Sequence, residues 1–188
     1  MELLGEDKEA AIKVFQATRH GSVDLKEAEE SGLRAEFVGR HLSDRLGDDP
    51  QGNFGAMSIG IFDDCYGKGA WINVAKVISI LVTMGRDGTE LRGNLTDEQG
   101  EELEGAYSFF RGRPLEFLHA ETTGKFFDSS HGPDTAKNYG EMVLTVSDNR
   151  NGEAISLNLA SVISLVKDAG REAFYKRQIG ADTGGMAL

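Results

Sequence analysis

An internal repeat spans most of this chain. When the sequence is shifted by 85 positions, residues 33–92 align with residues 118–177 without a gap, and 19 of the 60 aligned residues are identical. Such self-similarity indicates a duplicated structural unit. Two copies are too few for a solenoid, which buries a continuous core by stacking three or more units. We therefore predict two related units that close on each other as a pseudo-dimer.

The apolar pattern within each copy predicts strands followed by a helix. Residues 57–61 alternate between apolar and small or polar side chains, a period of two that is typical of a half-buried antiparallel strand. A glycine-containing turn and a second strand follow, which together form a hairpin. From Val77 to Leu81 the spacing becomes helical. We therefore predict an α+β fold made of an internally duplicated unit, several antiparallel strands and then an amphipathic helix.

Helices are also expected outside the repeats. Residues 8–18 have apolar side chains at helical spacing, residues 24–30 suggest a second short helix, and Thr96 with Gln99 forms a capping-box pattern at the start of a connector helix. The predicted organisation is an acidic helical segment at 1–32, repeat 1 at 33–92, an acidic helical connector at 93–117, repeat 2 at 118–177, and a flexible tail at 178–188.

The net charge of −11 is unevenly distributed along the chain. Residues 1–32 carry 8 acidic and 4 basic side chains, and residues 93–117 carry 6 and 2, whereas each repeat has a net charge of −1. Phosphate binding needs clustered lysine and arginine side chains. Because the repeats are nearly neutral, the total charge does not exclude a nucleic-acid partner for them.

The cysteine content and the hydropathy pattern favour an intracellular protein. Cys65 is the only cysteine, so no disulfide can form within the chain, and no signal-peptide pattern is present at the N-terminus. The longest apolar stretch, residues 70–84, is shorter than a bilayer-spanning helix. We expect a cytoplasmic or nucleoid-associated location and no membrane segment.

No catalytic constellation is evident in the sequence. Cys65 lies in a turn beside acidic residues, which disfavour its thiolate. The four histidines share no metal-ligand spacing, and the glycine-rich turns match neither a P-loop nor a dinucleotide fingerprint. We therefore expect a non-enzymatic protein without a cofactor or a metal.

The junction between strand and helix resembles a known family. The segments WINV and ISLNL each pass directly into an amphipathic helix, and residues 115–119 look similar to an aromatic-rich strand. This pattern resembles the whirly and PC4-like superfamily of single-stranded nucleic-acid-binding proteins, in which two ββββα repeats occur in one chain. The resemblance implies a whirly-like pseudo-dimer that binds single-stranded DNA or RNA and associates into homo-oligomers through its helices.

Binding of single strands needs aromatic faces for the bases and basic groups for the phosphates. Aromatic residues beside strands are more often core residues, but Trp71 aligns with Ser156, so its position tolerates a polar, exposed side chain. Asn73 and Asn158 are interpreted as helix caps. The predicted nucleic-acid-binding residues are Trp71, Lys68, Tyr66, Arg40, Arg34, Lys125, Phe127, Lys137, Tyr139 and Arg150.

A protein-binding role is the alternative. The acidic helices, with residues such as Glu29, Asp97 and Glu102, would attract a basic protein partner, as in an inhibitory or nucleic-acid-mimicking module. Exposed acidic helix faces are, however, usually just solvated. Single-strand binding by the repeats is the first hypothesis.

Overall fold

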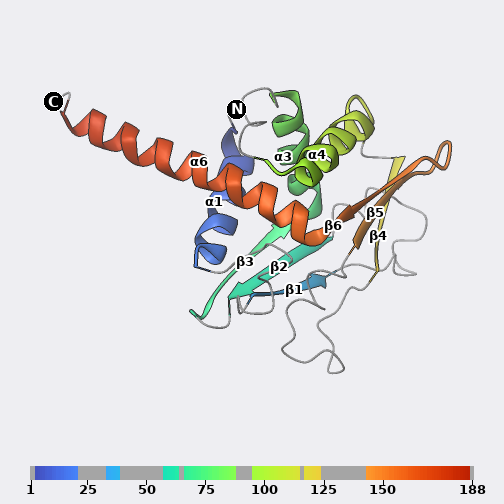
Figure 1. The fold of residues 1–188 in the computed structure, drawn as a ribbon, viewed down its shortest axis with the longest axis horizontal. Coiled ribbons are helices and arrows are strands. Elements are labelled where there is room, and N and C mark those ends of the chain that lie inside the picture. The colour runs from blue at the N-terminus through green and yellow to red at the C-terminus, as the bar shows by residue number, and fades with distance from the viewer. Residues whose placement is uncertain are drawn as a thin grey trace.

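The protein has four described helices on one side and two small antiparallel sheets on the other (Figure 1). The computed structural model describes residues 3–20, 33–38, 57–63, 66–87, 95–114, 117–123 and 143–186. The α+β class predicted from the sequence is confirmed. The elements are α1 (Gly5–Thr18), β1 (Leu33–Val38), β2 (Ser58–Asp63), β3 (Lys68–Asn73), α3 (Val74–Arg86), α4 (Asp97–Phe110), β4 (Leu118–Thr123), β5 (Val143–Asp148), β6 (Ala154–Asn158) and α6 (Leu159–Met186).

Within the described ranges, both sheets have three strands in sequential order, β1-β2-β3 and β4-β5-β6. The pairing of their first two strands starts at equivalent residues: Leu33 pairs with Asp63 in the first sheet, and Leu118 pairs with Asp148 in the second. The strands β4 and β5 and the helix α6 each begin 85 residues after β1, β2 and α3. The spacing of these elements along the chain therefore equals the spacing of the sequence repeat.

Turn and cap residues explain where the hairpins close and the helices begin. Gly67 and Gly152 have positive φ angles of 65° and 75°, which glycine adopts without steric cost. The Asn73 side chain accepts a hydrogen bond from the Ala75 N–H at 2.8 Å, and the Asn158 side chain accepts one from Ser161 at 3.3 Å. The predicted role of both asparagines as helix caps is confirmed, because each side chain satisfies an N–H of the first helical turn.

The apolar faces of both sheets and all four helices meet in one continuous core. Ile59 and Ile61 of β2 are fully buried, as are Leu144 and Val146 of β5, in agreement with the predicted alternation. The stripe predicted for α3 is buried as well, from Val77 to Leu81. The apolar face of a sheet must be buried against another element, and the helices bury this face of both sheets.

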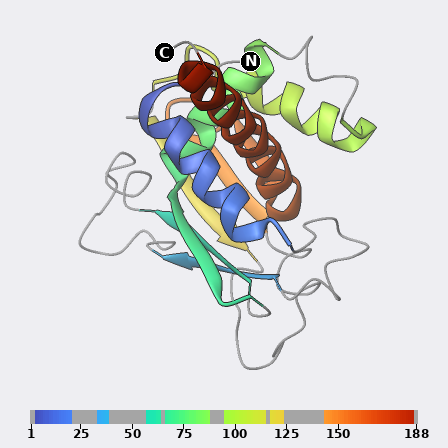
Figure 2. The same ribbon diagram turned by 90° about the vertical axis from the view of Figure 1, so that its left-hand side faces the viewer.

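The helices outside the repeats pack across the two units. Helix α1 contacts β2 and β3 of the first unit and lies beside α6, which follows the second sheet (Figure 2). Helix α4 contacts β6 of the second unit and packs against α3, which follows the first sheet. Each of these 14-residue helices thus contacts the last strand of one sheet and the helix that follows the other sheet.

Glycines stand where these helix pairs come closest. A Cβ atom added to Gly170 of α6 would overlap the Ala11 carbonyl group of α1, and one added to Gly85 of α3 would overlap Tyr107 of α4. Gly85 and Gly170 are aligned in the sequence repeat. Their lack of a side chain allows both pairs of helices to approach closely.

The structure differs from the sequence prediction at the C-terminal end of the chain. Helix α6 continues to Met186, so most of the expected tail at 178–188 is helical, and Figure 1 shows this part of α6 extending beyond the rest of the protein. The short helix expected at 24–30 lies outside the described residues.

Capping of α4 by Thr96 and Gln99 is confirmed, because each side chain accepts a hydrogen bond from the other residue's backbone N–H, at 3.2 and 3.1 Å.

We expect Gly170→Ala to lower the free energy of unfolding by about 1–3 kcal/mol, because the added methyl group forces α1 and α6 apart. Gly180→Ala is the matched control on the same helix, since a Cβ atom there meets nothing within 4 Å. It should leave stability unchanged or raise it by up to about 1 kcal/mol. Urea denaturation measures both, and equal stabilities for the two variants would contradict the close helix contact.

Candidate nucleic-acid interface

An aromatic pair covers the outer face of the first sheet. Because side chains alternate along β3, Ile72 points into the core whereas Trp71 lies on the opposite face and is 47% exposed. The ring of Trp71 contacts that of Phe62 edge to face, with 5.5 Å between the ring centroids. A Cβ atom on Gly60 would lie 2.8 Å from both rings. The indole therefore rests above Gly60 and keeps a solvent-accessible surface.

The second sheet has a polar group at the same place. Ser156 aligns with Trp71, Ser147 with Phe62, and Thr145 with Gly60. The Thr145 and Ser156 hydroxyl groups are hydrogen-bonded to each other at 2.9 Å. The fold therefore does not require an aromatic side chain on this outer face, and the aromatic pair is a specific feature of the first unit.

A hollow of about 560 Å³ lies between α1 and the edge strand β3. The described residues that line it include three cationic side chains and no carboxylate, in a chain whose net charge is −11. Lys13 comes from α1, Arg19 directly follows the last residue of α1, and Lys68 comes from β3. The other described lining residues are Gln16, Ala17, Gly67, Gly69 and Ala70. This cationic hollow has the local charge that an anionic ligand needs.

Tyr66 connects the turn before β3 to the end of α1. Its backbone N–H donates to the Asp63 carboxylate at 3.2 Å, and its ring packs on His20 with the centroids 4.5 Å apart. The Tyr66 side chain is 57% exposed. One part of its surface is occupied by His20, so Trp71 presents the better platform for a base.

Arg150 belongs to an ionic network at the end of the second sheet. Its guanidinium donates to both oxygens of the buried Asp148 carboxylate, at 3.1 and 2.8 Å, and lies over the Phe117 ring. Arg113 also donates to Asp148, at 2.6 Å, and to Glu153, at 2.7 Å. These hydrogen bonds hold the pKa of the Asp148 carboxyl well below its usual range, and those from Arg150 have the largest effect. The contacts give Arg150 a structural role in this turn.

The remaining predicted residues are not brought into a described site. For Arg34 the structure describes the backbone, which pairs with Phe62 across β1 and β2. The predicted residues outside the described part of the chain are Arg40, Lys125, Phe127, Lys137 and Tyr139.

Sequence reasoning missed two residues of the cationic hollow, Lys13 and Arg19. Both belong to the segment 1–32, which was treated as an acidic unit outside the repeats. The usable signal is their position, since Lys13 lies within residues 8–18, whose apolar spacing predicts a helix, and Arg19 directly follows them. What the sequence does not show is that this helix lies beside β3.

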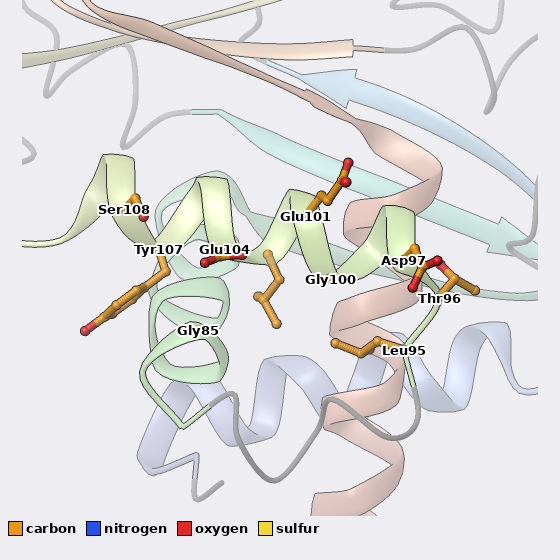
Figure 3. Close-up of a pocket in the computed structure, with 10 residues that line it drawn as sticks. Gly85, Leu95, Thr96, Asp97, Gly100, Glu101, Glu104, Tyr107 and Ser108 are labelled. Atoms are coloured by element: carbon orange, nitrogen blue, oxygen red, sulfur yellow. The ribbon is translucent and has the colours of Figure 1, made fainter.

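A second hollow, of about 610 Å³, lies beside α4 and is acidic. Asp97, Glu101 and Glu104 line it together with Leu95 and Tyr107, which lie toward its two ends in Figure 3. The two hollows thus have opposite charge. The acidic hollow is the place where a basic partner of α4 would bind.

Comparison with known protein families, with curated proteins and with solved structures found no match to this chain. None of the described helices is both long and apolar enough to cross a membrane. Within the described ranges, no group of three or more His, Cys, Asp or Glu side chains is placed to hold a metal ion.

We expect the acid stability of the protein to depend on Asp148. The folded-state pKa of this carboxyl is lowered from an unfolded value near 3.9, so its contribution to stability is present above about pH 4 and is lost as the pH falls further. Asp148→Asn should therefore be less stable than the wild type at neutral pH and lose less stability on acidification from about pH 5 to pH 3. Urea denaturation across this range measures the effect. Glu101→Gln, on the exposed side of α4, should follow the wild-type curve, and a parallel curve for Asp148→Asn would refute the prediction.

Proposed function

We propose that this protein binds single-stranded nucleic acid without catalysis, through the outer face and edge of the first sheet. The observation that carries the proposal is the exposed indole of Trp71 on the same edge strand as Lys68, which lines the cationic hollow. An aromatic face stacks on any base, and nearby cations contact the phosphates, so this combination favours single strands with weak sequence preference.

Three features support an aromatic surface that is adapted for a ligand. The Trp71 ring is supported from below by the sheet at Gly60 and from the side by Phe62. This support restricts the ring and reduces the entropy lost when a base stacks on it. The equivalent position in the second sheet, Ser156, is polar. An exposed tryptophan that the scaffold does not need is more readily explained by binding than by folding.

The duplicated, whirly-like pseudo-dimer is also part of the proposal. The 85-residue spacing of the elements supports it, as do the aligned carboxylates Asp63 and Asp148, each of which accepts a backbone N–H of the following turn. The corresponding helix contacts at Gly85 and Gly170 extend the likeness to α1 and α4. We include these helices in the unit, so that the described elements of each half have the order helix, three strands, helix. Association of several chains through helices is included as well, and the exposed side chains of Tyr175 and Ile179 on α6 support it.

The acidic hollow favours the alternative, a protein-binding module for a basic partner. Part of the charge of this hollow has a structural explanation, because Asp97 lies in the first turn of α4, where a carboxylate interacts favourably with the helix dipole. We therefore place this function second.

Trp71→Ala should weaken binding of single strands about 5- to 150-fold, the equivalent of about 1–3 kcal/mol for one stacked base. Fluorescence anisotropy with labelled oligo-dT and oligo-U at low salt measures the affinity. Because Trp71 lies outside the core, the variant should keep the wild-type unfolding transition.

Two controls make this test specific. Ser156→Ala alters the aligned position in the second sheet and should bind like the wild type, whereas Trp71→Phe keeps an aromatic ring and should retain part of the affinity. Wild-type protein that fails to bind either oligonucleotide below about 10 µM would refute the proposed function, since non-specific nucleic-acid binding alone reaches about that range.

A further inference from the structure

Within the described ranges, the three cations of the hollow between α1 and β3 form no ion pair, although Asp63 lies opposite Lys68 in the register of β2 and β3. Neither Lys13 nor Lys68 forms an ion pair there, and both side chains are exposed. Arg19 is held in place by uncharged groups: it donates to the Tyr175 hydroxyl at 3.4 Å and lies over the rings of Phe15 and Phe174. Its guanidinium is therefore positioned by contacts that leave its charge available.

The corresponding part of the second unit has a different charge arrangement. Glu153 aligns with Lys68 in the repeat, and it is paired with Arg113 at 2.7 Å. Helix α4 lies beside β6 there, as α1 lies beside β3. The same architecture thus forms with a neutralised ion pair in one half and with gathered cations in the other. Mutual repulsion among Lys13, Arg19 and Lys68 opposes this clustering, and a bound anion would relieve it.

We propose that the hollow between α1 and β3 is a phosphate-binding pocket, which holds the backbone of the strand whose base stacks on Trp71. Its assignment to a nucleic-acid backbone rests on the proposed function. Lys68 and Trp71 are three residues apart on the edge strand β3, or about 10 Å along it, and alternation places their side chains on opposite faces, so a bound oligonucleotide would pass around this edge of the sheet. Arg19 supplies a forked pair of donors and the two lysines supply point charges, which together suit a phosphodiester.

Inorganic pyrophosphate tests the pocket without a base. In the amide NMR spectrum of the full chain, pyrophosphate should shift the signals of residues 67–70 and 16–19, and these shifts should disappear in the Lys13→Ala/Lys68→Ala variant. The control variant Lys8→Ala/Lys176→Ala also removes two lysine charges, but from residues that do not line the hollow, and it should respond like the wild type. If pyrophosphate leaves these signals unshifted in the wild-type protein, the inference of a phosphate-binding pocket is wrong.

Oligo-dT binding at several salt concentrations tests the link to single strands. Loss of two phosphate contacts should make the dependence of log Kd on log salt shallower by about 1.4, at about 0.7 per phosphate, whereas Trp71→Ala should lower the affinity and leave this slope unchanged. If oligo-dT binds and the pocket variant keeps both the affinity and the slope of the control, the pocket inference fails and the proposed function stands. If pyrophosphate shifts the pocket signals but oligo-dT does not bind, the phosphate pocket stands and the proposed function fails.

Discussion

The close approach of two pairs of helices, at Gly170 and at Gly85, is the constraint on which this structure depends. Each sheet has an apolar face that must be buried against another element. Helix α1 covers part of the first sheet while it contacts α6 of the second unit, and α4 contacts both the second unit and α3. A side chain at either glycine would separate a helix from its partner. The helices would then no longer hold the two units around one core.

Some of the acidic side chains of α1 and α4 make contacts that hold these helices in place. In α1, Glu6 pairs with Lys76 at 3.0 Å and Asp7 accepts a hydrogen bond from Ser79 at 2.5 Å, so both carboxylates tie α1 to α3. In α4, Glu102 accepts the Asn158 N–H at 2.7 Å, and burial raises the pKa of its carboxyl. These acids hold the helices to the units. Fewer carboxylates than the helix sequences contain are therefore left to attract a basic partner.

Sequence patterns predicted the local structure and failed at the packing of segments outside the repeat. The alternation around Ile59, the capping asparagines and the helical stripe from Val77 all reflect neighbours close in the chain, which is why they could be identified. The position of α1 beside β3 depends on contacts with distant residues such as Gly170. The residues of the cationic hollow are determined partly by local sequence and partly by tertiary packing. Lys68 was predicted as a site residue, but Lys13 and Arg19 join it through tertiary packing that no local pattern encodes.

The two units differ on the outer face and edge of their sheets, and this difference supports a binding role more directly than their likeness does. Residues that maintain the fold are alike in both: Asp63 and Asp148 close the turns, and Gly85 and Gly170 admit the helices. On the outer face and edge they differ, because Trp71 and Lys68 align with Ser156 and Glu153. In the second unit these polar groups are satisfied internally, by Thr145 and Arg113. In the first unit the indole surface and the lysine face solvent, and a ligand with both an aromatic ring and a negative charge would satisfy the two together.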